Sequence, residues 1–274
     1  MKFTNATKSD RKSGGELLPY ETLQPGKAAG VGEGCCALAV MAKAPRPGKV
    51  KTRLSPPLTP EQASELNICF LRDTTENIQQ VTEAGNSAGI VVYTPVGDEA
   101  AFDGILPPGF QLLGQRGEGF GERLLHACED LFACGFSSVC LIDSDSPTMP
   151  QDALLQAVMQ LSLPGDRLVL GGSDDGGYYL IGIKQSHPRL FEQIDWSTER
   201  VLEQTLERAR EIGLEAELLP TWYDVDDGAT LERLRRELLP GSGDGFAGYD
   251  ARHTRKYLAS LHTAPRMART GSSA

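Results

Sequence analysis

The chain has 274 residues, of which 40% are hydrophobic and 23% are charged, an ordinary balance for a globular protein with room for one large α/β domain. Its formal net charge of −10 argues against a nucleic-acid-binding protein, which should carry a basic surface. No apolar run reaches membrane-spanning length, and the N-terminus lacks the apolar core of a signal peptide. We therefore expect a cytoplasmic protein with neither a nucleic-acid partner nor a membrane span.

Both ends of the sequence differ from its middle. Residues 1–34 are rich in Lys, Ser, Gly and Thr without sustained periodicity, which predicts a disordered N-terminal extension. Residues 241–274 are similar, apart from a short helical pattern near 250–261, and we expect a flexible C-terminal tail. Residues 35–240 would then form the domain, and both ends should be dispensable for folding.

Apolar and amphipathic stretches alternate through the predicted domain. The expected strands are residues 35–42, 89–94, 111–114, 138–143, 167–172, 178–183 and 215–219. The expected helices are a long one opening at Thr59-Pro60, followed by residues 119–135, 152–161, 197–212 and 230–238. Strands that alternate with helices predict a single Rossmann-like α/β domain with a mostly parallel mixed sheet and helices on both faces.

The six cysteines give no sign of a metal site or a disulfide framework. None of them forms a CxxC pair, and no Cys/His cluster has zinc-finger spacing. Most lie in apolar segments, which predicts buried free thiols in a reducing compartment.

A basic loop follows the first predicted strand. Its five cations within eleven residues are Lys43, Arg46, Lys49, Lys51 and Arg53. At the carboxyl end of a strand such a loop is suited to binding phosphate, with arginine as a bidentate donor and lysine as a point charge. Prolines and Gly48 shape the loop, although it lacks the spacing of a Walker loop. The alternative is a solvated surface loop.

Two further strands end abruptly in carboxylates. Asp143 and Asp145 lie two residues apart, so in extended structure they would point the same way. The two could share a hard cation such as Mg²⁺ or Mn²⁺, or one could bind the cation while the other orients its waters. Asp175 is followed by Gly176 and Gly177, which remove side chains where a group must approach the backbone. Each motif alone could equally be an ordinary turn with helix caps.

Three later or weaker motifs complete the candidates. The stretch 222–228 supplies Asp226 and Asp227, either of which could instead cap the following helix. Trp196 precedes Ser197 and Thr198, one of which is at least a helix cap, and the alternative role for Trp196 is simple packing. The glycine-rich stretch 114–123 precedes a helix whose amides could face an anion, although a flexible connection explains it equally well.

Taken in order, these motifs resemble a known family. The order KxPxPGxVKTRL, GxGxGERL, SDSP, DGGYYLIG, WST and DVDD resembles a bacterial family of GT-A-type nucleotide-diphospho-sugar transferase-like proteins over residues 36–239. Some members are named as glycosyltransferases of arsenosugar biosynthesis, and the motifs look more distantly like 2-phospholactate and molybdopterin guanylyltransferases. The resemblance is specific for a family and less so for a reaction, because the GT-A fold hosts both sugar transfer and nucleotidyl transfer.

The resemblance also implies roles for particular positions. The nucleotide-phosphate residues would be Lys43, Arg46, Gly48, Lys51, Arg53 and Arg123. The metal ligands for Mg²⁺ or Mn²⁺ would be Asp145 and Asp226. The substrate-binding residues would be Asp175, Gly176, Gly177 and Trp196, and the catalytic ones Asp175, Asp145 and Lys51. Asp143 stands where glycine is frequent in the family, and Ser146 where cysteine is frequent.

The implied reaction needs no covalent enzyme intermediate. A metal ion with Lys51 and Arg53 would stabilise the departing phosphate, while Asp175 would hold or deprotonate an acceptor hydroxyl. We expect a metal-dependent glycosyltransferase that takes a nucleotide-sugar donor and a small-molecule acceptor. The alternatives are a nucleotidyltransferase acting from a nucleoside triphosphate on a phosphorylated acceptor, and a non-catalytic nucleotide-binding protein.

Overall fold

The computed structural model describes residues 20–239 and 247–263. Its strands are β1 (Glu21–Thr22), β2 (Cys36–Lys43), β3 (Ser87–Thr94), β4 (Gln111–Gly114), β5 (Ser138–Ile142), β6 (Leu168–Ser173), β7 (Tyr178–Ile183) and β8 (Ala216–Trp222). Its helices are α1 (Pro60–Ala84), α2 (Phe120–Ala133), α3 (Gln151–Ser162), α4 (Val201–Glu211), α5 (Gly228–Leu238) and α6 (Arg252–Thr263), with short 3₁₀ turns at Thr52–Leu54, Glu99–Phe102 and Pro188–Phe191. None of the helices described is long and apolar enough to cross a membrane.

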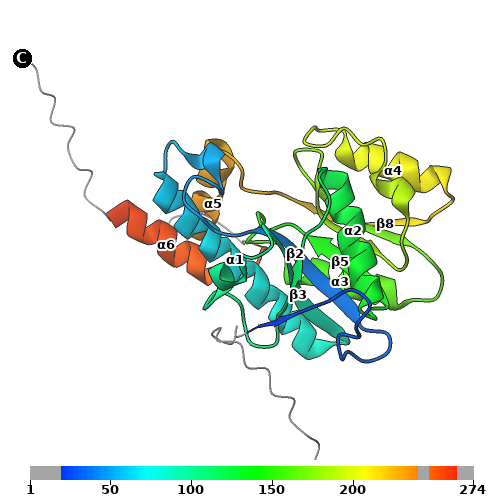
Figure 1. The fold of residues 1–274 in the computed structure, drawn as a ribbon. Coiled ribbons are helices and arrows are strands. Elements are labelled where there is room, and N and C mark those ends of the chain that lie inside the picture. Colours follow the sequence, from blue (N-terminus) through cyan, green and yellow to red (C-terminus); the bar gives the residue numbers. More distant parts are fainter. Residues whose placement is uncertain (1–19, 240–246, 264–274) are drawn as a thin grey trace, which may run out of the picture.

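The strands form one mixed sheet in the order β1-β4-β3-β2-β5-β7-β6-β8 (Figure 1). β7 runs antiparallel to both of its neighbours, and every other pairing is parallel. β7 is reversed because only four residues separate it from β6, a connection long enough for a hairpin but not for a crossover. The predicted fold class is confirmed.

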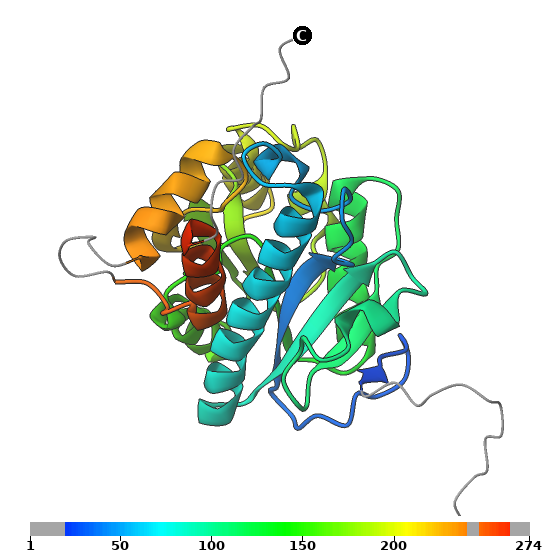
Figure 2. The same ribbon diagram turned by 90° about the vertical axis from the view of Figure 1, so that its left-hand side faces the viewer.

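Helices cover both faces of the sheet. Side chains of β2 alternate between two cores, with Leu38 and Val40 facing one and Ala37 and Ala39 facing the other, as the period of a strand requires. The first core packs under α1 and α3, and the second packs under α2 and α4. Figure 2 shows α1 lying across the front of the sheet, with α6 and α5 beside it.

Helix α1 begins where the sequence predicts. Thr59 accepts a hydrogen bond from the backbone N–H of Gln62 (3.2 Å), and the Gln62 side chain accepts one from the N–H of Thr59 (2.9 Å), with Pro60 at the first helical position. Helix α4 begins later than predicted. Residues 197–200 form turns, in which Thr198 accepts from the N–H of Arg200 and Ser197 has a φ of +65°.

The predicted domain boundaries differ from the structure at both ends. β1 pairs with β4, Leu23 is 6% exposed, and the N–H of Ala29 donates to the carbonyl of Cys134, so residues 20–34 pack on the domain. α6 packs against α1 and α5, with Leu258 in their shared core. The polar composition of both segments hid the few apolar residues that anchor them. The rest of the predicted extension and tail lies outside the described residues.

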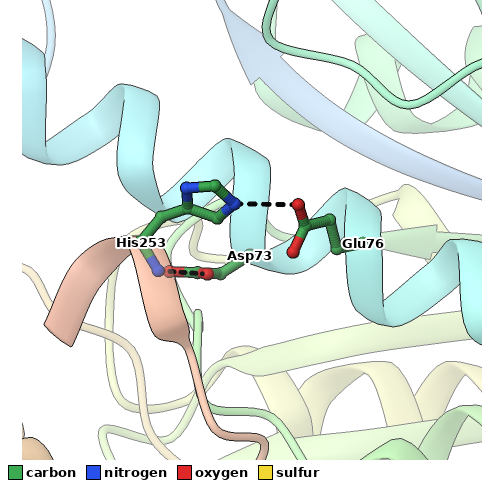
Figure 3. Close-up of side chains that lie close together, drawn as sticks. All are labelled: Asp73, Glu76 and His253. Carbon is green, nitrogen blue, oxygen red and sulfur yellow. Dashed lines mark hydrogen bonds and ion pairs between the residues drawn. The ribbon is translucent and has the colours of Figure 1, made fainter. Parts of the chain in front are cut away.

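Helix α6 is attached to α1 through a carboxylate. The two oxygens of Asp73 accept the backbone N–H groups of His253 (2.9 Å) and Thr254 (2.8 Å), two of the amides that the start of a helix leaves without intrahelical partners (Figure 3). Glu76, one turn further along α1, accepts from the side chains of Arg252 and His253. The start of α6 is therefore capped from another helix.

We expect Asp73→Ala to lower the free energy of unfolding by about 1–3 kcal/mol, because it leaves two N–H groups of α6 without partners. Residues 252–261 should also exchange their amide hydrogens faster. Urea unfolding and hydrogen exchange measure the two effects, and Glu83→Ala, an exposed change on the same helix, is the control. Unchanged exchange in α6 would contradict the proposed cap.

Candidate active site

The topology gathers four of the predicted segments at one edge of the sheet. β2, β5, β6 and β8 are mutually parallel, so their carboxyl ends meet there together with the start of β7. The basic loop follows β2, Asp143 and Asp145 follow β5, the turn with Asp175 joins β6 to β7, and Asp226 follows β8. Ligands of parallel α/β sheets bind at this edge.

Lys51 is the centre of the gathered charges. Its side chain is 4% exposed, and its Nζ lies 2.8 Å from Asp145 Oδ1, 3.0 Å from Asp226 Oδ1 and 2.8 Å from the carbonyl oxygen of Val225. Burial lowers the pKa of the amine, but the two carboxylates outweigh burial and hold the pKa above its ordinary value. The ammonium group is therefore charged, and its three protons all have acceptors.

A basic cavity of about 260 Å³ opens beside this ammonium group. It is lined by Lys43, Lys49, Val50, Lys51, Thr52, Arg53, Asn67, Ser144, Asp145 and Asp226. Lys43 and Lys49 are exposed and form no ion pair with any residue of the described ranges 20–239 and 247–263. Three of the six residues that the resemblance assigned to phosphate binding, Lys43, Lys51 and Arg53, line this one cavity.

The other predicted phosphate residues lie outside the lining of that cavity. Arg46 is ion-paired with Asp98 (2.5 Å) on the surface. Arg123 lies over the ring of Phe120, with its guanidinium carbon 6.0 Å from the ring centroid. Gly48 has a φ of +70° and shapes the loop without reaching the cavity. The amides before α2 do not form an open anion site either, because Glu122 accepts from the N–H groups of Glu118 and Gly119.

A second, acidic cavity of about 420 Å³ shares a wall with the basic one. Its acidic lining residues are Asp143, Asp145, Asp175, Glu199, Asp224 and Asp226, and its aromatic ones are Phe120, Tyr178 and Trp196. Arg53, Asp145 and Asp226 line both cavities. Trp196 packs edge-to-face on Phe120 at 5.2 Å between centroids, so an aromatic wall faces the carboxylates.

The carboxylate of Asp143 is hydrogen-bonded within its own loop, and both Asp143 and Asp145 line the acidic cavity. Its Oδ1 accepts from the N–H groups of Asp145 (3.3 Å) and Ser146 (3.2 Å), and its Oδ2 accepts from the hydroxyl of Ser146 (2.8 Å). Burial and the neighbouring Asp145 raise the pKa of Asp143 well above its ordinary value. Asp143 therefore holds the loop that positions Asp145.

Burial raises the pKa of Asp224 to about 6, and the neighbouring carboxylates of Asp175 and Asp226 add to the increase. Asp224 therefore holds its proton to a higher pH in the folded protein than in the unfolded chain.

Because of this raised pKa, we expect the free energy of unfolding to fall as the pH rises. The measurement is made with a chelator present, so that no metal ion binds the carboxylates. Between about pH 4 and pH 6 the unfolded chain has released the Asp224 proton while the folded chain still binds it, so the free energy of unfolding falls with rising pH. Asp224→Asn should flatten this slope and be more stable than the original protein at pH 7. Urea unfolding at several pH values measures it, and an identical slope in the variant would contradict the assignment.

The glycine pair after Asp175 has a structural explanation. Gly176 has a φ of +88°, and a Cβ there would lie 2.1 Å from the carbonyl oxygen of Glu199. The group that approaches this backbone is thus the chain's own segment before α4, and Gly176 is not among the residues that line the two cavities. Gly177 does line the acidic cavity, and its N–H donates to Asp175 Oδ1 (2.8 Å).

The two candidate aspartates after β8 divide their roles. Asp227 caps α5 by accepting from the N–H groups of Ala229 and Thr230 (both 2.9 Å). Asp226 instead faces Lys51 and both cavities. Asp227 is therefore the helix cap, and Asp226 remains the candidate site residue of the two.

Among the described residues, one group of three acidic or histidine side chains has ligand atoms within 4.8 Å of one another, and it is Asp73, Glu76 and His253 (Figure 3). These donors are satisfied without an ion, because Asp73 caps α6 and Glu76 binds Arg252 and His253. Asp145 and Asp226, the predicted metal ligands, are paired with the ammonium group of Lys51 and line both cavities.

Several residues that line the two cavities were not predicted from the sequence, and two of them are polar groups close to the predicted site. Asn67 reaches the basic cavity from α1, about fifteen residues beyond the basic loop. Asp224 stands two residues before Asp226, in a motif in which only the later aspartates were singled out. The spacing of Asp224 and Asp226 could have indicated that Asp224 belongs to the site. Nothing in the helical pattern around Asn67 distinguishes that residue from a core position.

The described cysteines agree with the sequence. All six are buried free thiols, and burial raises the pKa of Cys69 to about 12.

Comparison with known proteins supports the predicted relationship. Residues 77–198 match a family model described as an uncharacterized protein conserved in bacteria, DUF2064. The crystal structure of a proposed nucleotide-diphospho-sugar transferase from Desulfovibrio desulfuricans G20 is 29% identical, with a TM-score of 0.70 over 84% of this chain and 97% of that one. The resemblance to nucleotide-diphospho-sugar transferases is confirmed. The predicted class of enzyme, a transferase, is confirmed with it.

More distant structures align over much of the chain. A CMP:2-keto-3-deoxy-manno-octonic acid synthetase complexed with CTP is 13% identical, with a TM-score of 0.48 over 73% of this chain and 96% of that one. A nucleotidyl transferase from Methanothermobacter thermautotroptrophicus is 15% identical, with a TM-score of 0.48 over 74% and 97%. These similarities are too low to bear on the function. No curated protein matches the chain significantly.

Proposed function

We propose that the protein is a metal-dependent glycosyltransferase that uses a nucleotide-diphospho-sugar donor. The observation that carries the proposal is the shared wall of Arg53, Asp145 and Asp226 between a basic cavity and an acidic one. A diphosphate in the basic cavity would place the attached sugar at this wall, next to groups that accept hydrogen bonds from hydroxyls. The related Desulfovibrio protein, itself a proposed nucleotide-diphospho-sugar transferase, supports this assignment.

The cations of the basic loop would have different roles in binding phosphate. Lys43, Lys49 and Arg53 would contact the diphosphate, because their positive charges face the cavity. Lys51 has no proton left for a phosphate while it holds Asp145 and Asp226, so it positions these carboxylates and supplies a fixed positive charge. Asp145 and Asp226 would hold Mg²⁺ or Mn²⁺, which supplies charge stabilisation to the departing diphosphate.

The acidic cavity suits an acceptor that carries hydroxyl groups and no phosphate. Asp175 is exposed there and already accepts the N–H of Gly177 with one oxygen, which fixes the orientation of the carboxylate. A hydroxyl could donate to Asp175 while a sugar ring packs against Trp196. A phosphorylated acceptor would instead face six acidic side chains and the single cation Arg53. This asymmetry of charge favours glycosyl transfer.

The second candidate is nucleotidyl transfer from a nucleoside triphosphate. The observation in its favour is the number of cations that the basic cavity offers to phosphate, since Lys43, Lys49 and Arg53 line it in addition to the fixed charge of Lys51. A triphosphate carries more negative charge than a diphosphate and would make fuller use of them. In both reactions we retain the prediction of a cytoplasmic protein with small-molecule partners.

The two candidates release different products. The purified protein is incubated with Mn²⁺, a mixture of nucleotide sugars and nucleoside triphosphates, and a deproteinised small-molecule cell extract as the source of acceptor. We expect release of a nucleoside diphosphate from one nucleotide sugar, with Asp175→Asn as the inactive control. Release of pyrophosphate from a triphosphate, with no nucleoside diphosphate from any sugar donor, would overturn glycosyl transfer. Nucleotide binding with neither product would instead indicate a non-catalytic protein.

A further inference from the structure

Asn67 is a buried polar residue of the basic cavity that the proposed mechanism leaves without a role. It lies on α1, is 4% exposed and lines the cavity beside the basic loop. Its side-chain oxygen Oδ1 has no hydrogen-bond partner among the residues described. Asn77, buried nearly three turns later on the same helix, donates its amide to the carbonyl of Met149 (2.9 Å). Its Oδ1 also lacks a partner among the described residues, but Asn77 does not line the cavity.

A buried acceptor without a partner is costly, because it has lost its hydrogen bonds to water and gained none. Leucine has nearly the same size and would remove that cost at position 67. Such unsatisfied groups are typical of sites at which a ligand supplies the missing partner. The position of Asn67 in a cavity wall, rather than in the packed core, points to a ligand as that partner.

The chemistry of the acceptor, Asn67 Oδ1, indicates which kind of ligand group would bind it. Oδ1 accepts a hydrogen bond, so its partner must be a donor, and phosphate oxygens at neutral pH are acceptors. We infer that Asn67 accepts a hydrogen bond from a ribose hydroxyl of the bound nucleotide. This inference rests on the proposed function, in which the phosphates of that nucleotide lie against Lys43, Lys49 and Arg53. Asn67 is thus a binding residue for the nucleoside part of the donor.

The test compares ligands with and without a nucleoside. Binding of pyrophosphate and of the diphosphates of adenosine, cytidine, guanosine, uridine and thymidine is measured by calorimetry with Mg²⁺, for the original protein, Asn67→Leu and Asn67→Ala. Both variants should bind the preferred nucleoside diphosphate about tenfold more weakly and bind pyrophosphate unchanged. Asn67→Leu should also melt at a higher temperature without ligand.

Thr74→Val is the matched control. Thr74 is buried on the same helix and its hydroxyl also lacks a partner among the described residues, but it does not line the cavity. This variant should bind every ligand as the original protein does. The inference alone would be overturned if Asn67→Leu and Asn67→Ala bound the nucleoside diphosphate as tightly as the original protein does. It would also be overturned if they lost affinity for pyrophosphate and the nucleoside diphosphate equally. An original protein that binds no pyrophosphate and no nucleoside diphosphate would overturn the proposed function as well.

Discussion

Replacing Lys51 with methionine is expected to lower the free energy of unfolding by about 2–4 kcal/mol at pH 7, because it leaves Asp145 and Asp226 facing each other without the cation between them. The loss should be smaller than for a fully buried pair, since the two carboxylates are 34% and 45% exposed. The methionine would keep the apolar contact with the buried ring of Phe70, over which Lys51 Nζ lies at 5.5 Å. The lost stability is thus electrostatic.

Urea unfolding at pH 7 measures this loss, and Lys49→Met is the matched control. Lys49 belongs to the same loop but is exposed, so its substitution should change stability by less than about 0.5 kcal/mol. Mg²⁺ should restore part of the stability of the Lys51 variant, because an ion bound to the two carboxylates would replace the missing charge. A Lys51 variant as stable as the original protein would contradict the central position given to this ammonium group.

The sequence predicted the sheet well because strand and helix periodicity depend on burial. β2 alternates between two cores, and Thr59 with Gln62 closes a local capping box, so each element carries its own signal. The sequence of β1 carries almost no such local signal. It contributes two exposed residues to the sheet edge, and only the pairing with β4 and the burial of Leu23 make it part of the fold. Contacts between segments that are distant in the sequence leave no local pattern from which β1 could have been predicted.

The same contrast explains the site. The edge of the sheet could be predicted, because parallel strands bring Lys51, Asp145 and Asp226 together by topology alone. Which way each side chain turns could not be predicted. Asp143 bonds to its own loop, Arg46 turns away to Asp98, and neither choice follows from spacing. Asn67 was missed because a helix that packs on a core hides a polar residue aimed at a cavity.

Asp145 carries the largest expected effect on activity. Its carboxylate lies between the two cavities, fixed by Lys51 on one side and by the loop that Asp143 holds on the other. Asp145→Asn keeps the shape but removes the charge that a divalent ion would require. We expect the metal-dependent release of nucleoside diphosphate to fall by about a hundredfold or more, since the group acts on charge that develops during the reaction.

The fold should survive this substitution, because Lys51 would retain two of its three acceptors, Asp226 and the carbonyl of Val225. The circular dichroism spectrum and the cooperative unfolding transition of Asp145→Asn should therefore match those of the original protein. Asp174→Asn is the matched control, since Asp174 lies at the same sheet edge but pairs with Arg233 and lines neither cavity. It should keep full activity. An Asp145→Asn protein with unchanged metal-dependent activity would remove Asp145 from the metal site and leave the basic cavity as the only part of the proposal still supported.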